Sequence, residues 1–547
     1  MITLTLAAIL VVALFAHFSG QPEADERGML VRALETRAAV VVVFATTFVV
    51  LWYSWAAWNP IPVVHDEMAY VLQAQIFARG RWALPSPPLP AFWEQPHVLV
   101  EPVLAAKYFP GHALAMSLGA LVGWPALMPL VMQSTIAALL FVLARRVASG
   151  GVAFLACIIW LFSLMVLVFG PTYFSESTTT ICWMAGWYAL LAWRTTRTRS
   201  WLLAVAFCTG WCAIARPLTG LAFAIPIGVV VLRDIVAERR WKDLFFAIAV
   251  GVAVMAILPL WSVLTTGDWR VTPWTVYTRM YMPYDVPGFG MNTTPPTHTI
   301  TPDLARLNDA YSSAHKTHVP STLLATLGAR TSHLIFSVWG GTGGILAVFA
   351  LLGLRTLGST TAFAVASSVL LLVVYLAYAT PAPWTLYYYE SVPAYALLTA
   401  AGMAWAASLI GRPRLHPFSR SFAWSSPRWT RALVAGALVL VLPGLVTLQL
   451  IRGRHIGERK ALTAFNRLLA SIHDPRAVVF VRYTATHDPH KSFVRNTANP
   501  QAERIWVVYD RGERENARLR AHAPDRTAYL FDESMGRIYQ YDPSGVK

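Results

Sequence analysis

Long apolar stretches separated by short charged connections recur along the whole chain. An apolar stretch of about 18 residues can cross a bilayer as a helix. The first stretch has no basic residues before it and no Ala-x-Ala cleavage site, so we interpret it as a retained helix rather than a signal peptide. The pattern predicts about twelve spanning helices, at residues 2–19, 38–58, 125–144, 151–170, 177–193, 201–215, 217–232, 243–264, 333–354, 361–379, 391–410 and 432–451.

Basic residues gather in alternate connections between these helices. The connections are short, so the excess of positive charge predicts that they face the cytoplasm. Both termini and the other set of connections then lie outside. The basic residues are Arg27, Arg32, Arg37, Arg145, Arg146, Arg194, Arg197, Arg199, Arg233, Arg239, Arg240, Lys242, Arg355, Arg412, Arg414, Arg420, Arg428 and Arg431.

Three of the predicted outer segments are long. Residues 59–111 are rich in Pro and aromatic residues and predict short helices and turns at the interface. Residues 265–330, the lid segment, are too long for a structureless connection and predict a lid or a small subdomain. In the tail, residues 452–547, charge density rises. Its pattern predicts a small α/β domain with strands at 477–483, 505–509 and 527–531 and a helix at 516–522.

The predicted organisation is therefore an extra helix and loop over 1–37, a membrane module over 38–451 and the tail domain over 452–547. Composition agrees, because 56% of the 547 residues are hydrophobic and only 13% are charged. The net charge is +16, but its placement in short loops is a topology signal and predicts no nucleic-acid partner. All four cysteines lie in apolar stretches, which favours packing over disulfide or metal chemistry.

Two adjacent acids, Asp66 and Glu67, follow His65 near the start of the first outer segment. A transferase acting on a hydroxyl or amine needs a carboxylate to take a proton or to orient the acceptor. Acids are also common where a helix begins, because they face its positive end. The pair is the first candidate for catalysis.

Further candidates lie at other predicted membrane edges. Lys107 precedes Tyr108 and a Pro-Gly break, and its ammonium suits a lipid phosphate, although interfacial lysines also extend to water without binding anything. Glu176 lies in a tight outer turn, and Arg216 runs against the charge bias, which predicts an anionic partner: a phosphate, or Glu176 in a structural ion pair. We predict that substrate contacts come from His65, Tyr108, His112, Tyr173, Glu176, Tyr388, Tyr389 and Glu390.

The order of these motifs resembles the GT-C glycosyltransferases. The resemblance rests on the acid that opens the first outer loop, Lys-Tyr-Phe-Pro-Gly from Lys107, a helix ending Leu-Ala-Arg-Arg, the Ser-Glu turn at Glu176 and Ala-Arg-Pro around Arg216. The similar branch holds bacterial relatives of protein O-mannosyltransferases and of aminoarabinose transferase. It implies a polytopic α-helical membrane protein of GT-C type with about twelve transmembrane helices and a small C-terminal α/β extracytoplasmic domain.

The resemblance also implies an activity. Such enzymes take a sugar from a polyprenyl-phosphate carrier on the outer face of the membrane and invert its anomeric centre. Asp66 becomes the base and Glu67 the second acid of the mannosylating branch. Lys107 holds the lipid phosphate, and Arg216 supports it.

The chain also departs from the family pattern. Tyr387 to Glu390 occupy a place where relatives carry an arginine, which shifts leaving-group stabilisation toward Lys107, Arg216 or Arg330. Metal dependence varies in the superfamily, so a divalent cation at Asp66 and Glu176 stays open, and no other cofactor is implied. The sugar is left open, as is the acceptor, which is a protein, a lipid or a polysaccharide. The implied location is the bacterial inner membrane, with the site and tail facing the periplasm.

Two other functions stay open at this point. A lipid-linked sugar transporter would favour charges in the middle of spans and inverted repeats, whereas this chain gathers its candidates at one face. A non-catalytic membrane assembly protein would use the polar loop to bind a partner. We therefore predict a glycosyltransferase whose acids and cations converge on one outward-facing pocket.

Overall fold

The computed structural model describes residues 26–298, 301–340, 343–357, 359–411 and 427–541. The chain folds into two compact units, each assembled from three stretches of sequence. The helical unit comprises residues 1–58, 129–255 and 321–454, and the mixed unit comprises residues 59–128, 256–320 and 455–547.

Apolar helices build the helical unit. One of them, α6, begins two residues ahead of the unit, and α20 ends beyond it. The elements are α2 (Glu26–Glu35), α3 (Arg37–Trp55), α6 (Leu127–Val147), α7 (Gly150–Leu161), α8 (Leu164–Phe169), α9 (Glu176–Thr196), α10 (Arg199–Ala215), α11 (Pro217–Glu238), α12 (Trp241–Met255), α16 (Leu323–Trp339), α17 (Gly343–Leu357), α18 (Ser359–Val374), η4 (Tyr375–Ala377), η5 (Thr385–Ser391), α19 (Val392–Gly411) and α20 (Pro427–Glu458).

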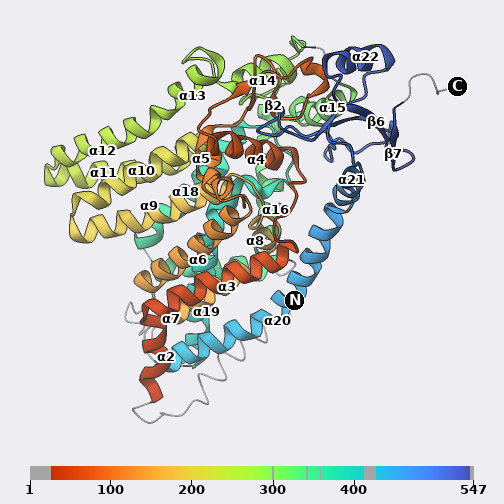
Figure 1. Ribbon diagram of the computed structural model, residues 1–547. Helices are drawn as coiled ribbons and strands as arrows, with labels where there is room; N and C mark the ends of the chain where they lie inside the picture. Colours follow the sequence, from red (N-terminus) through yellow and green to blue (C-terminus); the bar gives the residue numbers. More distant parts are fainter. Residues whose placement is uncertain (1–25, 299–300, 341–342, 358, 412–426, 542–547) are drawn as a thin grey trace. The chain divides into compact units, whose positions relative to one another are not determined.

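Helices α9 to α12 lie side by side in Figure 1. At one end of this group, buried acids form ion pairs with basic residues of the connections. Arg194 Nε lies 3.0 Å from Asp234 Oδ2, and Arg199 Nε lies 2.6 Å from Asp243 Oδ1. These residues come from two of the loops predicted to share one side of the membrane, and the structure places both loops at one end of the helix group.

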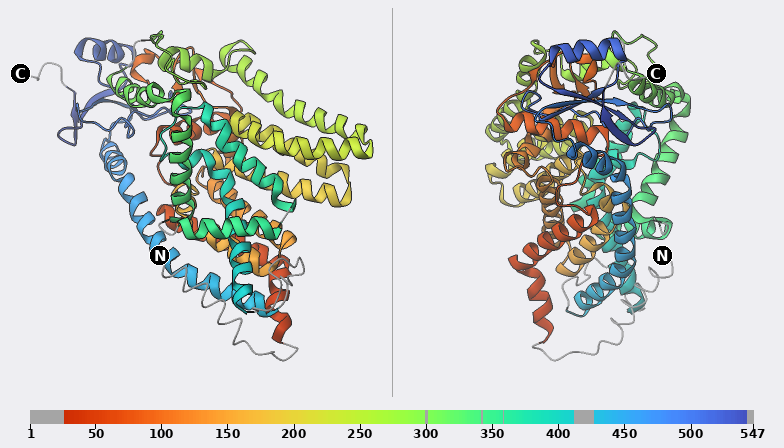
Figure 2. Two further views of the ribbon diagram at one scale, coloured as in Figure 1. Left: turned by 180° about the vertical axis from the view of Figure 1, so that it is seen from behind. Right: turned by 45° about the vertical axis from the view of Figure 1, so that its right-hand side comes forward.

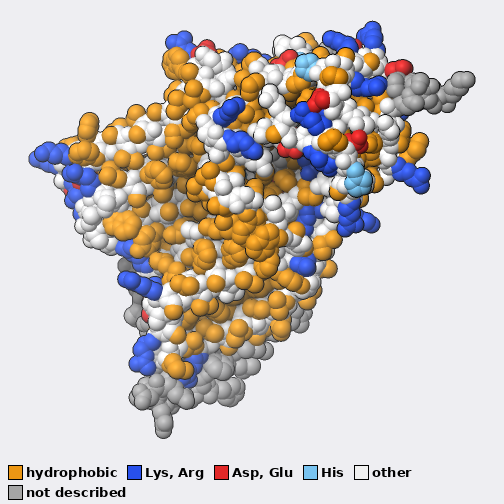
Figure 3. Space-filling model, in the orientation of Figure 1, with side chains coloured by type: hydrophobic (Ala, Val, Ile, Leu, Met, Phe, Trp, Pro, Cys, Tyr) orange, Lys and Arg blue, Asp and Glu red, His pale blue; other side chains and the backbone are white. Residues whose placement is uncertain are grey.

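The surface of the helices is apolar. Figure 3 shows hydrophobic side chains along their length. On α11 and α12 the exposed ones include Leu221, Val229, Phe245, Ile248 and Val252. Five helices among the described residues are long and apolar enough to span a membrane, and four shorter apolar helices accompany them. The chain is therefore a membrane protein, while the count of twelve spans stays a prediction.

Three predicted helices are wrong as single elements. The stretch 333–354 is divided between α16, which ends at Trp339 and is followed by Gly340 with a positive φ of 67°, and α17. The stretch 243–264 is divided at Ala256 into α12 and α13. The stretch 151–170 breaks after α7, where the Ser163 side chain accepts the N–H of Val166 and starts α8. Apolar composition masked these breaks. The predicted helix 2–19 lies outside the described residues.

Close helix packing depends on glycine at the contact between α17 and α19. A Cβ on Gly353 would lie 2.0 Å from the carbonyl oxygen of Leu398. A Cβ on Gly402 would lie 1.8 Å from the carbonyl oxygen of Phe349. Small residues let apolar helices approach closely where no hydrophobic gradient drives them together.

The mixed unit combines the polar segments with a sheet. The described elements are α4 (His65–Ala78), β1 (Leu84–Pro85), η1 (Pro90–Phe92), β2 (Val98–Leu99), β3 (Val103–Ala106), α5 (Pro110–Leu121), α13 (Ile257–Thr266), α14 (Pro273–Tyr281), α15 (Pro302–Thr317), η2 (Pro320–Thr322), α21 (Lys460–Ala470), β4 (Ala477–Arg482), β5 (Ile505–Tyr509), α22 (Glu513–His522), β6 (Thr527–Asp532) and β7 (Arg537–Gln540). The predicted strands and helix of the tail are all present, and β7 is additional.

The tail strands form one sheet in the order β5-β4-β6-β7, in which only β7 is antiparallel (Figure 2). Successive residues of a strand face opposite sides. Val478 and Phe480 therefore join one core, with Trp93 of the first outer segment and Leu519 of α22. Residues such as Val479 join the other core, with α21. The first outer segment thus packs directly on the tail sheet, so both contribute to one unit.

Candidate functional site

The first turn of α4 separates the two adjacent acids. Neighbouring residues on a helix point about 100° apart. Glu67 folds back, and its Oε2 accepts the N–H groups of Val63 at 3.0 Å and Val64 at 3.1 Å. Its carboxylate therefore caps the helix, which is the structural alternative that the sequence left open. Asp66 points elsewhere.

Asp66 sits among hydrogen-bonding aromatic and imidazole groups. Its Oδ1 accepts the hydroxyl of Tyr108 at 2.5 Å, and its Oδ2 lies 3.8 Å from His97 Nε2. Burial raises the pKa of Asp66, while the Tyr108 hydrogen bond and the charges of Lys107 and His490 act to lower that pKa. The side chain remains 26% exposed. A reachable carboxylate with a raised pKa is suited to accept a proton.

His97 was missed by the sequence analysis. It is only 4% exposed and adopts a left-handed backbone with φ of 65°. Its N–H donates to the Tyr277 hydroxyl at 2.8 Å, and its carbonyl accepts the N–H of Lys107 at 3.0 Å. Strained backbone of this kind is often held at functional sites. No local motif marked His97, because its partners Asp66 and Tyr277 are distant in the sequence.

Lys107 lies in an aromatic cage. It is only 1% exposed, and its Nζ lies 4.6 Å from the ring centre of Trp274, 5.0 Å from that of Tyr277 and 5.4 Å from that of Tyr108. Nζ also donates to Asp285 Oδ2 at 3.1 Å. Helix α14 supplies Trp274 and Tyr277, so the lid segment closes around this cation. Lys107 is a candidate phosphate ligand from the sequence, whereas its partners in the lid segment appear only in the structure.

His65 and His112 are fully buried. The ring of His112 packs edge-on against Tyr70, which itself stacks on Tyr108 at 4.6 Å. His65 Nε2 donates to the carbonyl of Pro489 in the tail, and burial lowers the pKa of His65 to about 3. Both residues were predicted to contact substrate. Their burial favours a supporting role beneath Asp66 and Tyr108.

The helical unit holds a separate polar cluster around Arg216, the residue between α10 and α11. The guanidinium pairs with Glu176 at the start of α9, donates from Nη2 to the Tyr375 hydroxyl at 2.9 Å and lies 3.9 Å from Glu390 Oε1. The ion pair between Glu176 and Arg216, which the sequence left open as the alternative to a phosphate partner, is present. Two acids thus share this arginine.

Other predicted contacts lie near this cluster. Glu390 is fully buried, and its Oε1 accepts the Thr179 hydroxyl at 2.5 Å. Tyr389 donates to Gln133 Oε1 at 2.8 Å. Tyr173 is buried, with its ring 4.9 Å from that of Trp55. The contacts of Tyr173 and Tyr389 are those of packed interior residues.

Arg330 lies on α16 and is buried. Its Nη1 donates to the carbonyl of Tyr375 at 2.6 Å and approaches the hydroxyl of Tyr388 at 3.4 Å. Its Nη2 donates to the carbonyls of Tyr378 and Thr380. The guanidinium satisfies carbonyl groups of η4 and of the residues that follow it, which explains its burial without a phosphate.

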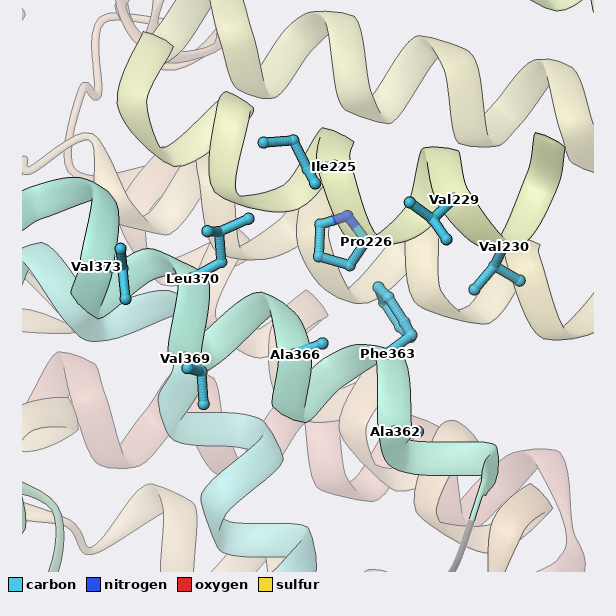
Figure 4. A pocket seen from close by; sticks show the side chains of 10 residues that line it. All are labelled: Ile225, Pro226, Val229, Val230, Ala362, Phe363, Ala366, Val369, Leu370 and Val373. Carbon is cyan, nitrogen blue, oxygen red and sulfur yellow. The ribbon is translucent and has the colours of Figure 1, made fainter. Parts of the chain in front are cut away.

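An apolar groove of about 630 Å³ lies between α11 and α18 (Figure 4). Its lining is hydrocarbon throughout, which suits an acyl or isoprenoid chain. Helix α11 begins directly after Arg216, and α18 ends directly before Tyr375. The lining residues are Ile225, Pro226, Val229, Val230, Ala362, Phe363, Ala366, Val369, Leu370 and Val373.

Two predictions about the site stay open: that its acids and cations converge on one pocket, and that Asp66 and Glu176 bind a divalent cation. Asp66 and Lys107 lie in the mixed unit, whereas Glu176 and Arg216 lie in the helical unit, so their convergence on one pocket stays a prediction. In the part of the chain that the structure describes, no group of three or more His, Cys, Asp or Glu side chains is arranged to hold a metal ion.

Comparison with solved structures identifies the fold. The apo structure of ArnT from Cupriavidus metallidurans matches with a TM-score of 0.51 and 15% identity, over 90% of this chain and 93% of that one. The structure of the same protein bound to undecaprenyl phosphate matches with a TM-score of 0.49 and the same identity and coverage. Arabinofuranosyltransferase AftD from Mycobacteria gives 0.36 at 15% identity, over 86% of this chain and 32% of that one. No family model and no curated protein matches the sequence. The chain has the fold of the GT-C glycosyltransferase superfamily.

Proposed function

We propose that this protein is an inverting glycosyltransferase that moves a sugar from a polyprenyl-phosphate carrier to an acceptor on the outer face of the bacterial inner membrane. The observation that carries the proposal is the pairing, within one unit of a GT-C fold, of a reachable Asp66 carboxylate with a caged Lys107 ammonium. The acceptor is a protein, a lipid or a polysaccharide.

The chemistry requires both charges. The acceptor oxygen attacks the anomeric carbon while the bond from that carbon to the phosphate oxygen breaks. Asp66 takes the proton of the acceptor hydroxyl, and the phosphate leaves with the bonding electrons. Lys107 stabilises the negative charge that develops on the phosphate. Attack from the face opposite the leaving group inverts the anomeric centre.

The carrier follows from the chemistry of the leaving group. Lys107 offers one compact positive charge, and its aromatic surroundings exclude water, which strengthens its attraction for a phosphate. An ArnT structure contains undecaprenyl phosphate, which is a fact about that protein. For this chain a polyprenyl phosphate is our proposal.

A deletion strain tests the proposal. Mass spectrometry of its surface glycans, lipids and glycoproteins should show one sugar missing, which wild-type protein restores. Asp66→Asn removes the proton acceptor with almost no change of shape and should fail to restore the sugar. Glu67→Gln is the matched control, because it keeps an oxygen for the helix cap. This variant should restore the missing sugar. Full restoration by Asp66→Asn at equal protein level would contradict the proposal.

A further inference from the structure

A turn of the tail contacts the helix that carries Asp66. His65 Nε2 donates to the carbonyl of Pro489. The ring of His490 stacks on that of His65, with centres 5.9 Å apart and planes 30° from parallel. Because His65 directly precedes Asp66, these two contacts bring the tail turn next to the candidate base, although more than 400 residues separate them in the sequence.

The lid segment contacts the same turn from α15. The ring of Tyr311 lies 5.9 Å from that of His490 at an angle of 61°. Arg306 Nη1 donates to the carbonyls of Thr484 and Ala485, at 3.3 Å and 2.5 Å. Three distant segments therefore meet around His490: the start of α4, helix α15 and the tail turn.

Hydrogen bonds and ion pairs within the turn and to its neighbours fix its conformation. The N–H of His490 donates to Asp488 Oδ1 at 3.1 Å. Asp488 also pairs with Lys491 at 3.1 Å. On the other side of the turn, His487 Nδ1 lies 2.6 Å from Glu533 Oε1. A side chain on such a turn loses little freedom when it binds a ligand.

Exposure distinguishes His490 from its neighbour. His65 is fully buried and its Nε2 is occupied by Pro489, so it anchors the turn. His490 is half-buried, as are Asp66 and Tyr311. An imidazole on a residue that is not fully buried can donate or accept a hydrogen bond, as recognition of a hydroxyl requires.

We propose that His490 is an acceptor-binding residue, whose imidazole hydrogen-bonds the acceptor near the hydroxyl that Asp66 deprotonates. The tail turn from Thr484 to His490 then selects the acceptor, while Lys107 serves the donor. The inference rests on the proposed function and deepens it, because it assigns the tail to the acceptor half of the site.

Two measurements separate the halves of the site. Donor binding is measured as retention of undecaprenyl phosphate by the full-length protein in detergent, using native mass spectrometry. Transfer is measured as the restored sugar in the deletion strain. His490→Ala should bind undecaprenyl phosphate within about twofold of wild type and lose at least about tenfold of the product. His490→Gln keeps a hydrogen-bonding group and should recover part of the lost product.

His473→Ala is the matched control, because it removes an exposed histidine from the same tail, and it should behave as wild type. Unchanged product with His490→Ala overturns the inference, as does a parallel loss of undecaprenyl phosphate binding. If the deletion strain lacks no sugar at all, the proposed function fails, and the inference fails with it. That result differs from one in which wild type restores the sugar and His490→Ala restores it equally.

Discussion

The hydroxyl of Tyr108 donates a hydrogen bond to Oδ1 of Asp66 at 2.5 Å. The bond joins the opening acid of the first outer segment to the residue after Lys107, so the candidate proton acceptor and the candidate phosphate ligand are linked through one aromatic side chain. The bond also stabilises the ionised form of Asp66 against the burial that raises its pKa. Under the proposed function, Tyr108 therefore influences the pH dependence of transfer.

Tyr108→Phe should shift the pH profile toward higher pH. Asp66 must be ionised to take a proton, so activity rises as pH passes its pKa. The Tyr108 hydrogen bond lowers the pKa of Asp66, so its removal should raise that pKa further. The acidic limb of kcat/KM should therefore move to higher pH. Tyr188→Phe, on α9 of the helical unit, is the control. An unmoved acidic limb in Tyr108→Phe would show that Asp66 is not the titrating base.

Asp285→Asn should tighten the binding of undecaprenyl phosphate. Asp285 occupies the one compact positive charge of the cage, 3.1 Å from Lys107 Nζ. A phosphate must displace this carboxylate, so its neutralisation removes a competitor. We expect affinity to rise by about tenfold, equivalent to about 1.4 kcal/mol, whereas Lys107→Gln should abolish tight binding. Native mass spectrometry or a fluorescent lipid titration measures both.

Asp309→Asn, on an exposed position of the same lid segment, controls for a general loss of negative charge. Weaker lipid binding by Asp285→Asn would instead mean that the carboxylate holds Lys107 in its productive position.

The sequence predicted the local elements of the fold well. The spacing of apolar residues and the length of apolar stretches predicted most helices and the three parallel tail strands, because both signals depend only on neighbouring residues in the chain. Asp66 and Lys107 were proposed as site residues from their place at a membrane edge. His97, Trp274 and His490 were not assigned to the site, since their roles arise only when the first outer segment, the lid segment and the tail fold together. The cap made by Glu67 shows the same limit, because an adjacent pair of acids looks equivalent until the helix start is known.

Glu67→Ala should destabilise the protein while Glu67→Gln should not. The carboxylate satisfies the two N–H groups of Val63 and Val64, which the helix itself leaves unbonded. Loss of such a cap costs about 0.5–2 kcal/mol. Thermal unfolding in detergent measures the difference. A variant Glu67→Gln with normal stability and transfer reduced at least about a hundredfold would instead make Glu67 part of the catalytic apparatus.

Acidification should weaken the contact between α4 and the tail. His65 has an ordinary pKa of 6.5 when unfolded and about 3 when buried. Between these values the unfolded chain binds the additional proton, so stability falls as pH drops below 6.5, by about 1.4 kcal/mol per pH unit. His65→Gln keeps a donor for the Pro489 carbonyl and removes this titration. Its midpoint of thermal unfolding should fall less between pH 7 and pH 5 than that of wild type. The exposed His473→Gln is the control, and an equal fall in His65→Gln would contradict the assignment.

The helical unit offers a test of how much buried charge its polar cluster needs. Arg216 faces two acids, and Glu390 is the more weakly held, because its Oε1 lies 3.9 Å from the guanidinium and its buried Oε2 has no hydrogen-bond partner among the described residues. An uncompensated buried charge is costly, so Glu390→Gln should leave the midpoint of thermal unfolding unchanged or raise it. Arg216→Gln leaves both acids buried without their cation and should cost about 3–5 kcal/mol. Glu176→Gln breaks the direct ion pair, and its loss of stability should lie between those of Glu390→Gln and Arg216→Gln. If Glu390→Gln destabilises the protein as much as Arg216→Gln, the second negative charge is a required part of the cluster, which would point to a bound cation or a proton held there during turnover.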